Sequence, residues 1–210
     1  MSKVTLAFDC ETGGLDPKQA DILTLYMGIL DEDFKVLEEL DLKLKPNSGL
    51  PRADAGALKK NKIDLQAHLA NPDTITYAQA KELIVPFLKR HLKKTGRYSN
   101  IRPLGYNVTF DIDFVQEHIL PTPEWNAIVH YGRIDPKGYT EFFKDAGWWP
   151  SDLGTLVSVV EFLGIPMREA HNAKEDTLMT IEVYKKMLDL MRSKKENGSS
   201  QDLISLLEAE

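Results

Sequence analysis

The first apolar segment of the chain leads into two acidic residues that are two positions apart. Residues 3–8 are apolar and β-branched, which predicts a strand, and the chain continues Asp9-Cys10-Glu11. Side chains alternate along a strand, so Asp9 and Glu11 are expected on one face. Two carboxylates this close raise each other's pKa unless a cation lies between them. The pair is therefore a candidate divalent-metal site, although Asp-x-Glu also occurs at solvated strand ends.

A second acidic segment joins a predicted strand to a predicted helix. Residues 105–111 read Gly-Tyr-Asn-Val-Thr-Phe-Asp, with a strand expected before them and a helix expected after them. An aspartate at a helix start caps the helix or complements its dipole. Asp111 is thus explained either as a helix-start residue or as a functional acid, and Asp113 is an alternative acid two residues further on.

A histidine and an aspartate stand at the start of the last strong helical pattern. Asn172 and Glu175 fit a capping box, which predicts that a helix begins near residue 173. His171 would then lie on the loop before the helix, and Asp176 in its first or second turn. Taken alone, the two residues are equally consistent with a surface histidine beside an acid that the helix dipole favours.

The three segments in this order, Asp-x-Glu-Thr, Asn-x-x-Phe-Asp and His-x4-Asp, resemble the DEDDh 3′→5′ exonuclease superfamily. This superfamily includes proofreading exonucleases of the polymerase III epsilon type, ribonuclease T and oligoribonuclease. Residues 7–17 are similar to its first motif, 105–115 to the second and 170–184 to the third, and 153–166 resemble the helix before the third. The resemblance covers about residues 1–192.

The resemblance implies a ribonuclease H-like fold and two Mg²⁺ or Mn²⁺ ions, with four acids as ligands: Asp9, Glu11, Asp111 and Asp176. The chemistry agrees, because two hard cations about 3.5–4 Å apart can activate water and stabilise charge during phosphodiester hydrolysis. Such cations prefer carboxylate oxygens, so Cys10 is expected to face the core instead. His171 is the implied general base, since an ordinary imidazole accepts protons near neutral pH.

In the family that this chain resembles, the turn after the first motif binds the free 3′ end of the substrate. By this resemblance the backbone amides of Thr12 and Gly13 bind the 3′-hydroxyl, and Leu15 wedges against the terminal base or simply packs. Asn107 and Phe110 join the substrate-binding set through the second motif, where Phe110 contacts a sugar or fills the core. The family usually reads Glu-Thr-Thr-Gly-Leu, so Gly13 is expected to keep the backbone contact and lose a hydroxyl.

The elements that must position these residues follow from apolar periodicity and turn residues. Strands are expected at 3–8, 22–31, 34–45, 101–106 and 127–134. Helices are expected at about 76–94, 111–119, 137–146, 152–163 and 173–192, and one short helix is expected within the irregular segment 46–74. This order predicts an α/β or α+β domain with a mixed sheet. With the ribonuclease H-like fold that the resemblance implies, we expect an α/β domain with a mixed five-stranded sheet flanked by helices.

The chain is expected to form one exonuclease domain at residues 1–192, followed by a linker and a short amphipathic tail at 193–210. The tail carries four aliphatic residues: Leu203, Ile204, Leu206 and Leu207. Two roles remain open for it. It docks on its own domain, or it binds a protein partner such as a polymerase.

Composition narrows the possible classes of protein. The 210 residues carry a net charge of −6, which argues against coating nucleic acid by bulk electrostatics but not against an acidic, cation-recruiting nuclease site. Cys10 is the only cysteine, which excludes an internal disulfide and a cysteine-cluster zinc site. No run of about 18 apolar residues and no signal-peptide pattern is present. We therefore expect a cytoplasmic protein with no membrane partner.

The favoured hypothesis is a metal-dependent 3′→5′ exonuclease that acts on the 3′ end of single-stranded DNA or RNA, releases nucleoside 5′-monophosphates, and serves DNA replication or repair. The alternative is a non-catalytic nucleic-acid-binding or polymerase-associated module of the same fold. Four acids and a histidine argue against it, because a binder gains nothing from clustered negative charge near phosphates. A metal-dependent phosphatase is a third hypothesis, for which no nucleophile motif is identified.

Overall fold

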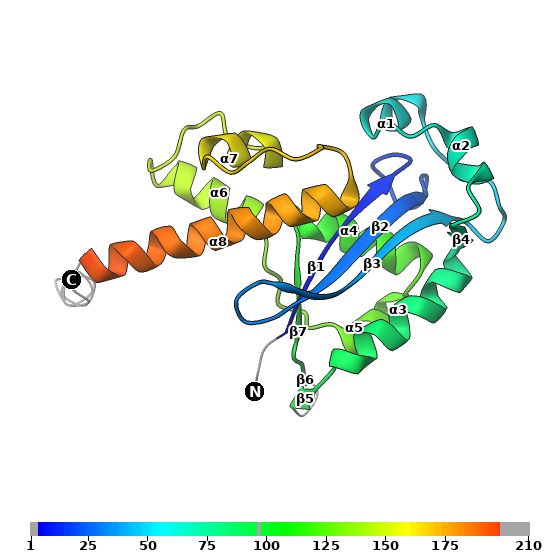
Figure 1. Ribbon diagram of the computed structural model, residues 1–210, viewed down its shortest axis with the longest axis horizontal. Coiled ribbons are helices and arrows are strands. Elements are labelled where there is room, and N and C mark those ends of the chain that lie inside the picture. The colour runs from blue at the N-terminus through cyan, green and yellow to red at the C-terminus, as the bar shows by residue number, and fades with distance from the viewer. Residues whose placement is uncertain (1–3, 96–97, 198–210) are drawn as a thin grey trace.

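A mixed five-stranded sheet with strand order β4-β3-β2-β1-β7 forms the centre of the molecule (Figure 1). The computed structural model describes residues 4–95 and 98–197. β1 (Val4–Thr12), β2 (Ile22–Leu30) and β3 (Val36–Lys45) pair as an antiparallel meander. β7 (Ile101–Leu104) runs parallel to β1, and β4 (Thr74–Thr76) runs parallel to β3. The α/β class and the five-stranded mixed sheet are therefore confirmed.

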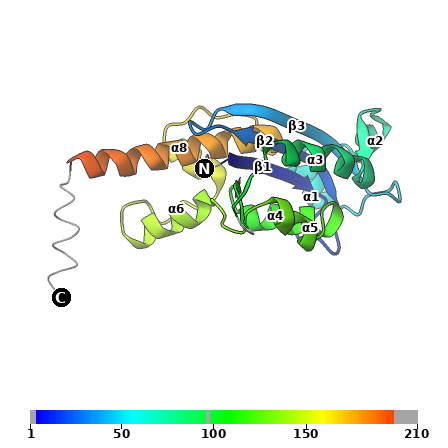
Figure 2. The same ribbon diagram turned by 90° about the horizontal axis from the view of Figure 1, so that it is seen from below.

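Helices cover both faces of this sheet (Figure 2). One face packs against α3 (Tyr77–His91), α4 (Val108–His118) and α5 (Thr122–Ile128). The long α8 (Ala173–Asn197) crosses the other face over β1 and β2. Two further helices, α6 (Pro136–Asp145) and α7 (Leu156–Phe162), pack on α8 around their own apolar cluster.

The alternation of side chains along β1 separates the core from the acidic pair. Leu6, Phe8 and Cys10 belong to the large core beneath α3, α4 and α5. Ala7 instead packs with Ile181 of α8 on the opposite face. Asp9 and Glu11 share the parity of Ala7, so they leave the sheet on the α8 side, as the strand period predicts.

Two short helices, rather than one, interrupt the segment between β3 and β4. α1 (Ala55–Lys60) and α2 (Leu65–Ala70) are each capped by an aspartate whose side chain accepts backbone hydrogen bonds. A capping box formed by Thr76 and Gln79 begins α3. A two-stranded pair, β5 (Lys94–Thr95) with β6 (Tyr98–Ser99), was not predicted by the sequence pattern.

The strand expected at 127–134 is wrong. Thr122–Ile128 forms α5, and the only sheet-like contact recorded nearby is an isolated bridge between Leu104 and Ile134. Pro121 and Pro123 favour the start of a helix, and a short apolar run by itself does not distinguish a buried helix from a strand. The fifth strand is β4, on the opposite edge of the sheet.

The last helix is longer than its apolar pattern indicates. α8 continues to Asn197, five residues into the segment expected to be a linker. Residues 198–210, including the four aliphatic residues of the amphipathic tail, lie outside the described residues. Within residues 4–95 and 98–197, no helix combines the length and apolarity required to span a bilayer.

Candidate active site

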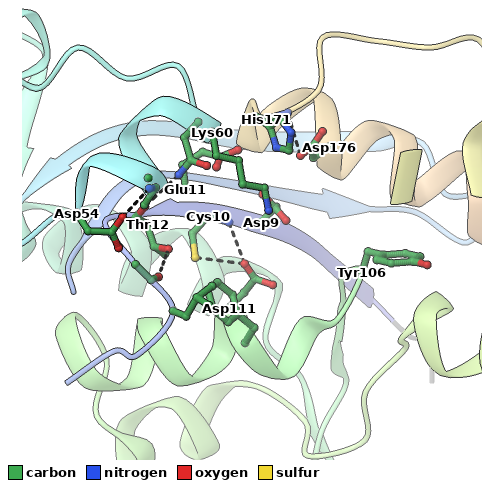
Figure 3. A pocket seen from close by; sticks show the side chains of 16 residues that line it. Asp9, Cys10, Glu11, Thr12, Asp54, Lys60, Tyr106, Asp111, His171 and Asp176 are labelled. Carbon is green, nitrogen blue, oxygen red and sulfur yellow. Dashed lines mark hydrogen bonds between the residues drawn. The ribbon is translucent and has the colours of Figure 1, made fainter. Parts of the chain in front are cut away.

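The C-terminal end of β1, α1, the start of α4 and the start of α8 surround a pocket of about 430 Å³ (Figure 3). All five residues predicted to be catalytic line it: Asp9, Glu11, Asp111, His171 and Asp176. These residues come from positions up to 167 apart in the chain. The fold therefore assembles one acidic pocket from the three sequence motifs.

Three of the four acids converge most closely. Asp9 and Glu11 of β1 and Asp176 of α8 each offer a carboxylate oxygen, and these oxygens lie within 4.8 Å of one another. Oδ1 of Asp176 is buried and has no hydrogen-bond partner. A buried oxygen without a donor is costly unless something absent from the protein chain satisfies it.

Asp111 reaches the pocket differently, from the α4 side of the sheet. Its Oδ1 accepts hydrogen bonds from the backbone N–H of Cys10 at 3.0 Å and from the Cys10 thiol at 3.2 Å. The side chain of Asp111 is almost fully buried, whereas Asp113 is exposed. Of the two acids that the sequence left open, Asp111 is the one in the pocket.

The four carboxyl groups crowd negative charge into a buried space. Burial, followed by the charges of its acidic neighbours, raises the pKa of Glu11 to about 7. Burial likewise raises the pKa of Asp111 to about 7 and that of Asp176 to about 6. The pKa of Asp9 lies well above its ordinary value because of burial and the charges of Asp111, Glu11 and Asp176.

These shifts and the donor set fit a divalent cation. Crowded carboxylates raise one another's pKa when nothing positive lies between them, and a cation reverses this effect. All four donors are carboxylate oxygens, the ligands that hard cations such as Mg²⁺ and Mn²⁺ prefer. The Cys10 thiol belongs to the core on the other face and contacts Asp111, which agrees with its expected core position.

His171 lies on the loop that precedes α8, in the left-handed region with φ of 66°. Its backbone N–H donates to Oδ2 of Asp176 at 3.3 Å, which ties the loop to the acidic cluster. Burial, together with the charges of Lys60 and Lys62, lowers the pKa of the imidazole. A neutral imidazole near the acids is in the form required of a proton acceptor.

Asn172 fixes the start of α8, and with it the position of Asp176. Its Oδ1 accepts hydrogen bonds from the backbone N–H groups of Lys174 at 3.1 Å and Glu175 at 3.2 Å. The Glu175 side chain does not complete the expected capping box, because it pairs with Nη1 of Arg168 at 3.0 Å. The sequence thus located the helix start correctly but assigned the wrong partner to Glu175.

The turn after β1 differs in part from its expected role. The backbone N–H of Gly13 donates to the carbonyl of Asp21 at 2.8 Å, so it is not available for a 3′-hydroxyl in this structure. The Thr12 hydroxyl donates to the carbonyl of Gly14 at 2.6 Å. Thr12 lines the pocket, and Leu15 stands at its mouth with 86% of its surface exposed. That exposure leaves Leu15 free to contact a base.

The two substrate-binding residues expected from the second motif lie in different places relative to the pocket. Phe110 lines the pocket and packs on Phe114 with ring centroids 4.8 Å apart. Asn107 is exposed, does not line the pocket, and adopts a left-handed conformation before α4. Its backbone N–H donates to Asp135 at 2.9 Å. Asn107 therefore lies outside the lining of this pocket, and its contact with a substrate stays a prediction.

Sequence reasoning missed the pocket residues that α1 and its flanks supply: Asp54, Lys60 and Asn61. No motif marks them, because they lie in the segment that the sequence leaves irregular. Tyr106 also lines the pocket, and its hydroxyl donates to the carbonyl of Gly154 at 3.3 Å.

Comparison with known proteins is consistent with this site. No family model matches the chain. An oligoribonuclease of Tropheryma whipplei (strain Twist) is 25% identical over 177 residues, which cover 82% of this chain and 85% of the relative.

Solved structures share the fold at lower sequence identity. The zinc-bound E. coli exonuclease I complex with single-stranded DNA matches with a TM-score of 0.70 and 21% identity, over 93% of this chain. The complex of the same enzyme with a dT13 oligonucleotide matches with a TM-score of 0.71 and 20% identity, also over 93%. The chain spans 42% and 43% of these two exonuclease I chains, which is less than half of their length.

The fold shared with exonuclease I, the sequence similarity to an oligoribonuclease and the three motifs that meet in one pocket agree with one another. Together they support the resemblance of this chain to the DEDDh 3′→5′ exonuclease superfamily.

Proposed function

We propose that the protein is a metal-dependent exonuclease that hydrolyses single-stranded DNA or RNA from the 3′ end and releases nucleoside 5′-monophosphates. The observation that carries this proposal is the convergence of Asp9, Glu11 and Asp176 oxygens within 4.8 Å, with His171 and Asp111 in the same pocket. The named relatives, an oligoribonuclease and exonuclease I, are consistent with it.

The acids would hold two Mg²⁺ or Mn²⁺ ions. Asp9, Glu11 and Asp176 form one group of ligands, and Asp111 adds a carboxylate from the α4 side. When bound, such ions polarise the phosphate and lower the pKa of an attacking water. The partnerless Oδ1 of Asp176 and the raised pKa of Glu11 support this occupancy.

His171 would remove the proton from the attacking water. Its imidazole is kept neutral by burial and by the nearby lysines, so a ring nitrogen is free to accept a proton. The hydrogen bond from its backbone to Asp176 holds the loop next to the acids. The loop position lets the ring move toward the water and away again after transfer.

The shape of the pocket supports action at a chain end. Leu15 stands exposed at the mouth, where an apolar side chain can contact the terminal base without reading its identity. Phe110 and Tyr106 supply rings on the wall next to Asp111. An open pocket of about 430 Å³ has room for one nucleotide, which agrees with the release of mononucleotides.

The direct test uses 5′-labelled single strands of DNA and RNA of matched sequence. With Mg²⁺ or Mn²⁺ we expect a ladder that shortens from the 3′ end one nucleotide at a time, and with EDTA no cleavage. Strands that carry a 3′-terminal block should resist, because the pocket receives a free end. Retention of the strand on a native gel without cleavage would instead favour the non-catalytic binding module.

A further inference from the structure

Lys60 is an exposed cation that lines the acidic pocket. It is the last residue of α1, it lines the pocket, and in Figure 3 its side chain extends from α1 toward the acids. Its charge lowers the pKa of Glu11, Asp176 and His171. No ion pair is recorded for Lys60 in the part of the chain that the structure describes. Its ammonium is therefore near the acids but is not held by any one of them.

The backbone that carries Lys60 is fastened to the end of β1. Nδ2 of Asn61 donates to the carbonyl of Thr12 at 3.0 Å, and the backbone N–H of Asp54 donates to the carbonyl of Gly13 at 2.8 Å. These two bonds join both ends of α1 to the strand that carries Asp9 and Glu11. These bonds fix the backbone position of Lys60 relative to the acids, while its exposed side chain extends from that backbone toward them (Figure 3).

The charges of an occupied site would favour an anion next to Lys60. Divalent cations would offset the charges of the carboxylates, so the Lys60 ammonium would lack a counter-charge and would attract negative charge that enters with the substrate. The group that enters is the scissile phosphate. A lysine ammonium is a compact point charge with three donors, which suits a phosphate oxygen.

We propose that Lys60 is a substrate-binding residue whose ammonium contacts a non-bridging oxygen of the scissile phosphate. This inference rests on the exonuclease function proposed above. It predicts that loss of the Lys60 charge acts in opposite directions on two ligands. Metal ions bind more tightly, because the acids lose a competing cation, and the phosphate binds more weakly.

The test compares Lys60→Met, which keeps the length of the side chain without its charge, with Lys59→Met as the matched control. Lys59 is the preceding residue of α1, is exposed, and does not line the pocket. Mn²⁺ affinity is measured first without nucleic acid. The affinity for thymidine 5′-monophosphate, the product that carries the former scissile phosphate, is then measured in saturating Mn²⁺, with thymidine as the phosphate-free probe.

We expect Lys60→Met to weaken thymidine 5′-monophosphate binding and to lower kcat/KM on an oligonucleotide, each by about 10–100-fold, the usual range for a charged hydrogen bond. Thymidine binding and the melting temperature should match those of Lys59→Met, and Mn²⁺ should bind more tightly. Lys60→Arg, which keeps the charge, should recover part of the loss.

Nucleotide binding and kcat/KM within twofold of wild type in Lys60→Met would overturn the inference. An equal loss of thymidine binding would overturn it too, because the contact would then not involve phosphate. If the wild-type protein degrades strands normally in either case, the exonuclease function stands and only the role of Lys60 fails. A wild-type protein that degrades no nucleic acid with any metal defeats the proposed function itself.

Discussion

The carboxylate of Asp111 takes the place of a missing strand beside Cys10. β7 pairs with β1 only as far as Leu104 opposite Ala7, while β1 continues to Thr12. The backbone N–H of Cys10 therefore has no partner strand on that edge, and it donates to Oδ1 of Asp111 at 3.0 Å. The Asp111 side chain thus accepts a hydrogen bond from a buried backbone N–H at the strand edge and also brings negative charge to the pocket.

Two substitutions at Asp111 separate these roles. Asp111→Asn keeps an oxygen acceptor for Cys10 and removes the charge, while Asp111→Ala removes both. We expect both variants to lose metal-dependent cleavage. Asp111→Ala should unfold more easily than Asp111→Asn by about 1–3 kcal/mol, the cost of an unsatisfied buried donor. Urea denaturation in EDTA measures this difference, and equal stability of the two variants would show that the Cys10 hydrogen bond contributes nothing.

Substitution of His171 tests the proton acceptor. His171→Ala should lower kcat by about 10²–10⁴-fold, the usual contribution of general base catalysis, while Mn²⁺ affinity remains at or above the wild-type value. His130→Ala serves as the control, since His130 does not line the pocket and packs against Tyr131. Turnover of His171→Ala within threefold of wild type would exclude the assigned role.

The raised pKa of Glu11 predicts how pH affects the metal-free protein. The pKa rises from 4.5 to about 7 on folding, so between these values the folded state binds a proton that the unfolded chain releases. Stability linked to Glu11 is therefore present at low pH and is lost as pH rises through about 7.

Thermal unfolding in EDTA at pH 5 and pH 8 measures this linkage. The melting temperature of wild type minus that of Glu11→Gln should be larger at pH 5 than at pH 8. The comparison with Glu11→Gln is required because His118 and His171, whose pKa values are lowered, titrate in the opposite sense. Mg²⁺ should stabilise the wild type more at pH 8 than at pH 5, because protons compete for its ligands. A difference in melting temperature between wild type and Glu11→Gln that does not change with pH would contradict the raised pKa of Glu11.

Packing alone already requires a glycine at position 13. A Cβ at this position would lie 2.3 Å from the carbonyl oxygen of Arg52 and 2.7 Å from Cα of Ala53. Gly13→Thr, which restores the residue usual in the family, should destabilise the fold by about 1–3 kcal/mol or more. Gly138→Ala in α6 meets no atom within 4 Å and should be neutral or stabilise by up to about 1 kcal/mol. Chemical denaturation of both variants checks this contrast, and an unaltered Gly13→Thr would refute the packing argument.

The parts of the site that share one element were readable from the sequence. Asp9 and Glu11 lie on one face because side chains alternate along a strand. Asp176 lies in the first turn of a helix whose start is indicated by the capping residue Asn172. The relation of Asp111 to Cys10 was not readable, because it depends on where β7 ends beside β1. Lys60 was not readable either, since nothing local to α1 indicates that hydrogen bonds to Thr12 and Gly13 place the helix over the acids.

The errors in the predicted fold have the same origin. Residues 127–134 carry an apolar run that is equally consistent with a strand and with a buried helix. Pro121 and Pro123 favour a helix start there, and α5 forms. β4 has three residues and is stabilised by pairing with β3, which no local pattern shows. Local periodicity thus predicted the long elements, while short elements depend on tertiary contacts.

The central claim is that acids from β1, α4 and α8 hold the catalytic cations together. Anomalous diffraction from crystals grown with Mn²⁺ and a nucleoside 5′-monophosphate tests it most directly. The account predicts two Mn²⁺ peaks in the pocket, contacted by the carboxylates of Asp9, Glu11, Asp111 and Asp176, with the phosphate of the nucleotide against them. A pocket that contains no Mn²⁺ at saturating concentration, or ions bound only elsewhere on the surface, would contradict it.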